Sequence, residues 1–340
     1  MSSPPRLGRR SLVVASLTTL ALAIVASPLP VARAARPAKP LRALTVWLDW
    51  YPNSDHAGIY IAMAKGYYAQ AGLAVRAQVP PGAADALPLV AHGNGDVAIS
   101  YEPEVLLARA RGVPVVATAS IVQEPLNCIM TLHSSGITRP RQLQGRTIAV
   151  AGAASDNTTI AALVKKDGGD LAKVKTVLVD YSLLQALLSH RADAIEGAYW
   201  TWEALQAAAQ GQPVNIMHVE HYGVPSYDEL VLATGAGQLT SEPGVLRAFQ
   251  KATLRGYAYA ATHPVEAARL LTAVPGVLSR SRSLIQTSIV RLAPLFHDAH
   301  GRYGTLDETR WQAYADWMTG TGLLHVHLDA HTALTTSVLP

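Results

Sequence analysis

Aromatic and acidic side chains gather in one short segment of the chain, where they could hold a flat polar molecule. The segment runs from Leu48 to Gly58 and reads LDWYPNSDHAG. Its polar side chains offer hydrogen-bond acceptors and donors, and its two rings offer flat faces for stacking. An alternative is a helix-capping turn, with Ser54 or Asp55 as the cap. The candidate ligand contacts in this segment are Asp49, Trp50, Asn53 and His56.

Two further turns join a strand pattern to a helix pattern. In the turn from Ser100 to Glu104, the side chains Ser100, Tyr101 and Glu102 could face a cleft. The alternative is simple helix entry, in which Glu104 is favoured by the helix dipole. The turn 152–157 would direct amide groups of a helix N-terminus outward, where they attract anions or polar ligand atoms. It matches neither GxGxxG nor GxxxxGK[ST], so nucleotide binding is not indicated.

A ring and a carboxylate lie four residues apart at Tyr199 and Glu203. If a helix begins near Trp200, the two side chains share one face of it. The ring could stack on a heteroaromatic ligand and the carboxylate could accept from its amino group, each contact contributing about 1–3 kcal/mol. An aromatic core stripe with a solvated glutamate is the alternative. Further along, Tyr227, Asp228 and Glu229 either line a cleft or form a hydrated turn.

The sequence predicts neither a catalytic residue nor a metal site. It contains no GxSxG elbow and no HExxH helix motif. Cys128, the single cysteine, lies among apolar neighbours that favour a buried, inert thiol. His325, His327 and His331 could bind a metal, but a polar C-terminal tail is the preferred interpretation. No cofactor is expected.

The elements that must position these residues alternate between strand and helix, which predicts an α/β protein with largely parallel sheets. Two lobes are expected, one from 42–125 with 230–340 and one from 130–225. The chain would cross between them near Glu124 to Met130 and near Val224 to Ala233, which creates a hinge and a cleft. Strands are expected at 44–48, 73–79, 96–100, 113–122, 147–151, 176–179, 192–197 and 214–219, and helices at 57–70, 87–92, 104–111, from 158, 182–189, 201–210 and through 243–320.

Residues 1–34 have the pattern of a secretory signal peptide. Arginines precede an apolar run from Leu12 to Ala26, and Ala32 and Ala34 fit a cleavage site after Ala34. The pair Arg9-Arg10 leaves Sec and twin-arginine export both open. The run is short for a membrane anchor. We therefore expect a periplasmic or secreted protein.

Charge and composition exclude other classes of protein. The 340 residues are 49% hydrophobic and 15% charged, which excludes an intrinsically disordered chain. Four of the 28 basic residues lie in 1–34, which holds no acidic residue. The remaining 24 balance the 24 acidic residues, so a nucleic-acid partner is not expected.

The segments together resemble the exported binding proteins for thiamine-pyrimidine precursors that serve ABC importers. The resemblance covers most of the chain after the signal, and its more specific pieces are 49–56 and 223–229. The matching stretches are LDWYPN at 48–53, HAGIY at 56–60, AKGYY at 64–68, RGVPV at 111–115, LQGRT at 143–147 and GVPSYDE at 223–229. The resemblance implies a periplasmic-binding-protein type II fold and a monomer that delivers a pyrimidine to a permease and its ATPase.

Pyrimidine-forming enzymes of the same family differ at the decisive positions. The resemblance places their cofactor lysine at Ser100 and their donor histidine at Glu104, and their cysteine cluster near Pro225 to Glu229, which holds no cysteine. Without the lysine no internal Schiff base forms. Capture of a formylaminopyrimidine or hydroxymethylpyrimidine is therefore expected. A sulfonate, taurine or riboflavin-like ligand, a pyrimidine-forming or pyrimidine-degrading enzyme, and a sensor module remain the alternatives.

Overall fold

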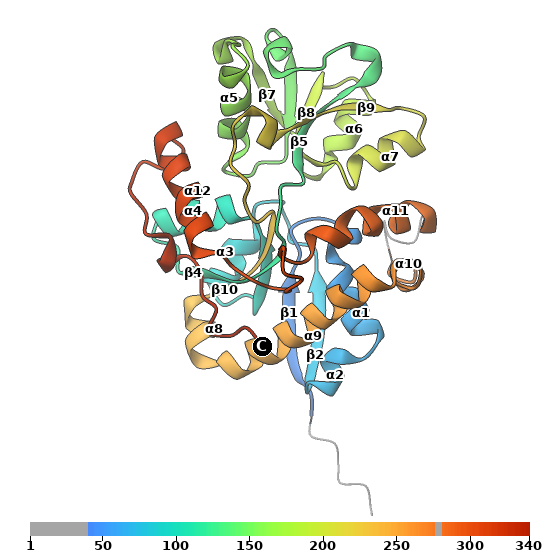
Figure 1. Cartoon of the computed structure of the whole chain (residues 1–340), viewed down its shortest axis with the longest axis vertical. Coiled ribbons are helices and arrows are strands. Elements are labelled where there is room, and N and C mark those ends of the chain that lie inside the picture. Colours follow the sequence, from blue (N-terminus) through green and yellow to red (C-terminus); the bar gives the residue numbers. More distant parts are fainter. Residues whose placement is uncertain (1–39, 276–280) are drawn as a thin grey trace, which may run out of the picture. The chain divides into compact units, whose positions relative to one another are not determined.

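The computed structural model describes residues 40–275 and 281–340, which form two five-stranded β-sheets with helices packed against them (Figure 1). The predicted signal peptide, residues 1–34, lies outside the described residues. The first sheet has the strand order β2-β1-β3-β10-β4 and the second the order β7-β6-β8-β5-β9. Their strands are β1 (Arg42–Trp47), β2 (Leu73–Gln78), β3 (Val97–Ser100), β4 (Val115–Val122), β5 (Asn127–Leu132), β6 (Thr147–Val150), β7 (Lys175–Leu178), β8 (Ala194–Tyr199), β9 (Val214–His218) and β10 (Leu230–Gly235).

Each sheet holds one strand that runs against its neighbours. β10 is antiparallel to β3 and β4, and β5 is antiparallel to β8 and β9. The prediction of largely parallel sheets was wrong for these two strands. The chain reaches β5 from β4 of the first sheet and β10 from β9 of the second sheet. Neither connection includes the α-helical crossover that a parallel connection within one sheet requires. The first crossing is 123–126, shorter than predicted, because β5 begins at Asn127.

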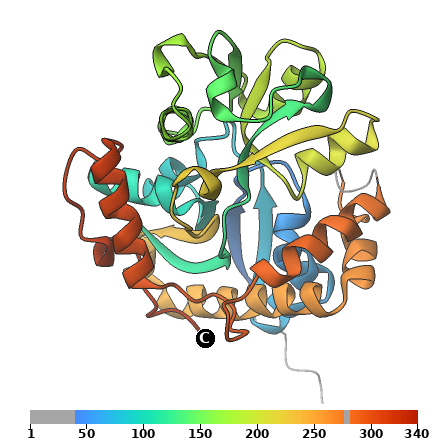
Figure 2. The ribbon, with the colours of Figure 1, turned by 45° about the horizontal axis from the view of Figure 1, so that its top comes forward.

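Helices cover the two sheets and complete two α/β lobes, one built on each sheet (Figures 1 and 2). The predicted helix 57–70 is divided at Gly66, whose φ of 69° lies in the left-handed region. The lobe boundaries given above stay a prediction, since the residues from Pro40 to Pro340 form one compact unit. The helices are α1 (Ala57–Ala64), α2 (Tyr67–Gln70), α3 (Ala86–Ala91), α4 (Glu102–Ala110), α5 (Asp156–Lys166), α6 (Leu183–Leu188), α7 (Glu203–Ala209), α8 (Ala236–Ser241), α9 (Pro243–Thr262), α10 (Pro264–Leu271), α11 (Arg282–Leu292) and α12 (Glu308–Thr321).

A close crossing of α1 and α9 braces the turn that carries the first candidate residues. A Cβ atom at Gly256 of α9 would collide with the carbonyl oxygen of Gly58 in α1, so the glycine allows the two backbones to touch. The neighbouring Tyr257 is fully buried, and its hydroxyl donates to the carbonyl oxygen of Asp55 at 2.7 Å. The long helix α9 therefore fixes the segment that follows β1.

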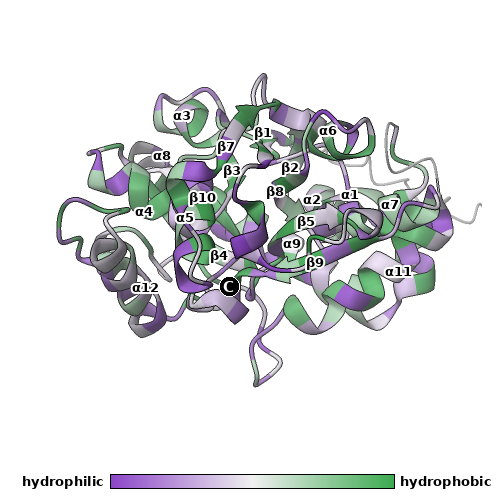
Figure 3. Ribbon diagram, turned by 90° about the horizontal axis from the view of Figure 1, so that it is seen from above, coloured by the Kyte–Doolittle hydropathy of each residue, from purple (hydrophilic) through white to green (hydrophobic). Residues whose placement is uncertain are grey.

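Apolar strands lie inside the molecule and mixed helices lie outside. Every residue of β4 and of β10 is buried, which is typical of strands covered on both faces. In Figure 3 helices such as α11 and α12 show both green and purple, as expected when one face packs on a core and the other meets solvent. No helix in 40–275 or 281–340 is both long and apolar enough to cross a bilayer.

Candidate functional site

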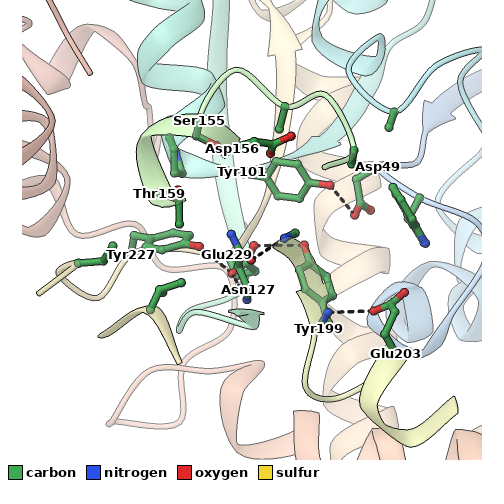
Figure 4. Close-up of a pocket in the computed structure, with 18 of the residues that line it drawn as sticks. Asp49, Tyr101, Asn127, Ser155, Asp156, Thr159, Tyr199, Glu203, Tyr227 and Glu229 are labelled. Carbon is green, nitrogen blue, oxygen red and sulfur yellow. Dashed lines mark hydrogen bonds between the residues drawn. The ribbon is translucent and has the colours of Figure 1, made fainter. Parts of the chain in front are cut away.

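A cavity lies between the two lobes, with walls from both of them, and holds about 770 Å³ of empty space when the solvent at its open mouth is included (Figure 4). Its lining residues come mainly from strand ends: Asp49 follows β1, Tyr101 follows β3 and Tyr199 ends β8. Ligands of open α/β sheets bind at this edge, beyond the carboxyl ends of the strands. Eight of the twelve predicted contacts line the cavity, namely Asp49, Trp50, Asn53, Tyr101, Tyr199, Glu203, Tyr227 and Glu229.

Asp49 is held in place by a histidine beneath it and a tyrosine beside it. The backbone N–H of Asn53 donates to Nδ1 of His56 at 3.3 Å, so the ring accepts through Nδ1 and donates through Nε2. Nε2 then donates to Oδ1 of Asp49 at 2.7 Å, and the Tyr101 hydroxyl donates to Oδ2 at 3.1 Å. His56 is fully buried and does not line the cavity. The ring of His56 therefore orients Asp49, and its two hydrogen-bond partners, Asp49 and the backbone of Asn53, include no serine or cysteine nucleophile.

Tyr199 and Glu203 lie together, but not on one helical face as predicted. Tyr199 is the last residue of β8, and α7 begins only at Glu203. The backbone N–H of Tyr199 donates to Oε2 of Glu203 at 2.9 Å, so the carboxylate folds back over the turn. Burial raises the pKa of Glu203 to about 7. Near neutral pH this side chain can therefore either donate or accept a proton in a hydrogen bond.

Glu229 joins the two chain crossings between the lobes. Its Oε2 accepts from the backbone N–H groups of Leu126 at 2.7 Å and Asn127 at 3.0 Å, and from the Tyr227 hydroxyl at 3.0 Å. Its Oε1 accepts from the Tyr199 hydroxyl at 3.2 Å. Burial raises the pKa of Glu229 to about 7, although these donors oppose the shift. Glu229 thus fixes two cavity rings as well as the hinge.

Four predicted contacts lie outside the lining of this cavity. His56 supports Asp49, and Ser100 lines a smaller neighbouring cavity with Asp49 and Tyr101. The side chain of Glu102 contacts the backbone of Asp228 instead: the Asp228 N–H donates to Oε2 of Glu102 at 2.7 Å. The carboxylate of Asp228, a predicted ligand contact, instead accepts from Arg310 and from Trp311 Nε1, the latter at 2.7 Å.

Asn127 and Asp156 also line the cavity, and the sequence did not single them out. Asn127 donates through Nδ2 to Oε1 of Glu196 at 2.9 Å and accepts from the Gly197 N–H at 3.0 Å. Burial raises the pKa of Asp156 to about 6. Asn127 was missed because β5 itself was missed, whereas Asp156 lies in the turn 152–157 that had been noted for its amides alone.

The cavity is acidic and aromatic. Its lining carries the carboxyl groups of Asp49, Asp156, Glu203 and Glu229, and the rings of Trp50, Tyr101, Tyr199, Tyr227 and Tyr314. None of the described residues that line it is Lys, Arg or His. Buried carboxylates repel an anion and attract a group that carries N–H donors or positive charge. Flat side chains add stacking surfaces.

Comparisons with known proteins agree with this architecture. Residues 53–267 match the family described as NMT1/THI5 like. A formylaminopyrimidine-binding protein of Halalkalibacterium halodurans is 33% identical over 302 residues, which cover 87% of this chain and 91% of that protein. The chain belongs to the NMT1/THI5-like family.

Other similarities of this NMT1/THI5-like chain concern a part of it or its fold. A 4-amino-5-hydroxymethyl-2-methylpyrimidine phosphate synthase of Saccharomyces cerevisiae is 34% identical over 110 residues, or 32% of each protein. The alkanesulfonate-binding protein of Xanthomonas axonopodis pv. citri, solved with MOPS, has a TM-score of 0.70 at 13% identity and covers 88% of this chain and 99% of its own. The predicted two-lobed periplasmic-binding-protein type II fold is confirmed.

The remaining reactive side chains of the NMT1/THI5-like chain lie away from the cavity lining. Cys128 is fully buried in β5, as predicted, and its thiol donates to the carbonyl oxygen of Ala198 at 3.1 Å. His331 pairs with Glu308 at 2.9 Å and His327 approaches Asp316 at 4.0 Å, so these histidines diverge. Among the residues described, no group of three or more His, Cys, Asp or Glu is placed to hold a metal ion.

Proposed function

We propose that this protein is the exported substrate-binding protein of an ABC importer and captures a 4-aminopyrimidine precursor of thiamine. The observation that carries the proposal is the cavity itself, with four carboxyl groups, five aromatic rings and no basic side chain in its described lining. The family and its formylaminopyrimidine-binding relative from Halalkalibacterium halodurans support the same class of ligand. The predicted signal peptide supports export, and a permease with its ATPase would receive the ligand.

A 4-aminopyrimidine presents an amine donor beside a ring-nitrogen acceptor. Glu203 matches that edge, because with a pKa of about 7 its carboxyl group can donate to the nitrogen while it accepts from the amine. Asp49 and Asn53 supply further polar atoms in the lining. The rings of Tyr199 and Trp50 would stack on the pyrimidine, each such contact contributing about 1–3 kcal/mol. Tyr199 is favourably placed for this because Glu229 fixes its hydroxyl.

Anionic ligands and enzymatic synthesis fit the lining less well. A sulfonate, taurine or nitrate group needs basic side chains or free amides, and the lining offers carboxylates. A flavin-sized ligand would have to place its ring system among the same carboxylates. A pyrimidine-forming enzyme that uses pyridoxal phosphate would need a lysine for the Schiff base, and the described lining contains none. We therefore propose binding without catalysis.

A thermal-shift panel tests this function. A ligand that binds the folded protein alone raises its melting temperature in proportion to RT ln(1 + [L]/Kd). We expect hydroxymethylpyrimidine and formylaminopyrimidine to raise it, and taurine, nitrate, methanesulfonate, thiamine and riboflavin to leave it unchanged. A shift with a sulfonate or riboflavin and none with either pyrimidine would overturn the proposal. An absorbance band of a Schiff base after incubation with pyridoxal phosphate would do the same.

Two variants test the assigned contacts. Tyr199→Ala and Glu203→Gln should each weaken binding of the pyrimidine about tenfold or more, which corresponds to about 1.4 kcal/mol. Glu266→Gln serves as the matched control, because Glu266 lies on α10, away from the cavity, and pairs with Arg269 at the surface. Calorimetry that gives equal affinities for the wild type and both cavity variants would remove these assignments.

A further inference from the structure

A carboxylate from one lobe caps a helix of the other lobe. Glu104 lies in the first turn of α4, on the first lobe, and it is half-buried. Its Oε1 accepts from the backbone N–H of Ser155 at 3.0 Å, and its Oε2 accepts from that of Ala154 at 3.3 Å. Both amides belong to the turn that leads into α5, on the second lobe. Ser155, which precedes the helix, makes no capping bond through its own side chain.

These amides belong to the wall of the cavity. Ala153, Ser155 and Asp156 line it, and Glu104 lines the smaller cavity next to it together with Asp49 and Tyr101. The N–H of Gly152, at the start of the same turn, is taken by Oδ2 of Asp156 at 2.8 Å. Two carboxylates of the chain therefore fill the positions at the start of α5 where the dipole and the free N–H groups favour negative charge.

We propose that Glu104 is a specificity-determining latch. When the lobes close, its carboxylate accepts from the N–H groups of Ala154 and Ser155, which are called the α5 amides below because they precede that helix. An anionic group of a ligand would need the same N–H groups. Closure then favours an uncharged or cationic pyrimidine and excludes the phosphate ester of the same ring. The inference rests on the proposed function, since it specifies which pyrimidines that site accepts.

A second contact between the lobes provides the comparison. Tyr181 donates from its hydroxyl to the carbonyl oxygen of Pro80 at 3.0 Å, and its ring meets that of Trp50 edge-on at 4.9 Å between centroids. The adjacent Asp180 accepts from the backbone N–H of Ala83 at 3.0 Å. Tyr181 therefore bridges the lobes without touching the α5 amides. Its loss should weaken closure and leave the preference for charge unchanged.

Calorimetry with two probes tests the proposal. The probes are 4-amino-5-hydroxymethyl-2-methylpyrimidine and its phosphate ester. For the wild type we expect the ester to bind at least a hundredfold more weakly than the alcohol. In Glu104→Ala the alcohol should bind about tenfold more weakly and the ester more tightly, so that the ratio falls at least tenfold. Glu104→Gln, which keeps the length and loses the charge, should change the ratio in the same direction.

Tyr181→Phe should weaken binding of the alcohol and preserve the ratio, because it removes a bond between the lobes and no carboxylate. A ratio in Glu104→Ala equal to that of the wild type would overturn the assignment of specificity. Tight binding of the ester by the wild type would overturn it as well.

A measurement without ligand separates this inference from the proposed function. Spin labels on cysteines introduced at Lys173 and Val265, both exposed and on different lobes, report the distance between the lobes. Cys128 does not compete for the labels because it is fully buried. The closed population should fall in Glu104→Ala relative to the wild type even if no pyrimidine binds. Equal closed populations in the two proteins would overturn the latch, whatever the ligand is.

Discussion

Glu229 should stabilise the protein chiefly as a hydrogen-bond acceptor for the hinge. Four donors converge on its two oxygens: two backbone N–H groups at the start of β5 and two tyrosine hydroxyls. In Glu229→Ala the hydroxyls can rotate, but the buried N–H of Leu126 and the partly buried N–H of Asn127 lose their acceptor. A buried donor without a partner costs about 1–3 kcal/mol. We expect a loss of about 2–4 kcal/mol in the free energy of unfolding.

Glu229→Gln separates the acceptor from its charge. The glutamine oxygen can accept from the two backbone N–H groups, while its NH₂ faces the hydroxyl of Tyr199, which can rotate to accept. All the groups keep partners, and replacement of the carboxyl group removes the burial cost that raises its pKa to about 7. We expect Glu229→Gln to lose less than about 1 kcal/mol, the net value of an ordinary hydrogen bond.

Urea unfolding at pH 8, followed by tryptophan fluorescence, gives both free energies, and calorimetry gives the melting temperatures. One kcal/mol shifts the melting temperature by about 2–4 °C in domains of 150–250 residues. At the lower value, which suits this longer chain, Glu229→Ala should melt about 4–8 °C below the wild type. Equal losses in the two variants would refute the acceptor argument, and so would wild-type stability in Glu229→Ala.

Three other predictions concern the acidic cavity, the helix crossing and the cysteine. Burial raises the pKa of Glu203 to about 7, so between about pH 5 and 7 the folded state holds a proton that the unfolded chain releases. The contribution of Glu203 to the free energy of unfolding therefore falls as the pH rises. Urea unfolding at several pH values should show a flatter dependence on pH in Glu203→Gln than in the wild type. An unchanged dependence would contradict the raised pKa of Glu203. Gly256→Ala should cost about 1–3 kcal/mol in the same assay through its collision with α1, whereas Gly244→Ala, in the same helix with open space around it, should cost nothing; equal effects would refute the packing argument. Cys128 is fully buried and burial raises its pKa, so a thiol reagent should modify it only after unfolding, and rapid modification of the native protein would contradict this.

Patterns along the chain predicted the elements well where periodicity and turn residues agreed. The strand that precedes Asp49 and the turn before α5 were both found from apolar runs bounded by polar turns. The antiparallel course of β5 and β10 was not found, because direction depends on how the chain crosses between lobes. β5 itself was taken for part of a crossing, since an apolar run next to a predicted hinge does not reveal which sheet it joins.

In the candidate site too, local sequence patterns predicted some residues and missed others. Residues directly after strands, such as Asp49 and Tyr101, lie on the cavity because parallel strands end at a common edge. Asp228 could not be separated from Glu229 by sequence, since adjacent side chains near a strand point to opposite sides. Arg310 and Trp311, which hold Asp228, come from a helix 82 and 83 residues away in sequence. Tyr314 reaches the cavity from the same distant helix, and no local pattern signals that.

Calorimetric titration with two ligands that differ at one position tests the central claim most directly. The probes are 4-amino-5-hydroxymethyl-2-methylpyrimidine and the matching compound with hydrogen in place of the amine, which keeps the ring nitrogens as acceptors. A cavity with four carboxyl groups and no basic side chain in its described lining should prefer the amine by about tenfold or more, since the analogue leaves a buried carboxyl oxygen without its donor. Equal affinity for the two compounds, or preference for the compound without the amine, would contradict recognition of an aminopyrimidine by this cavity.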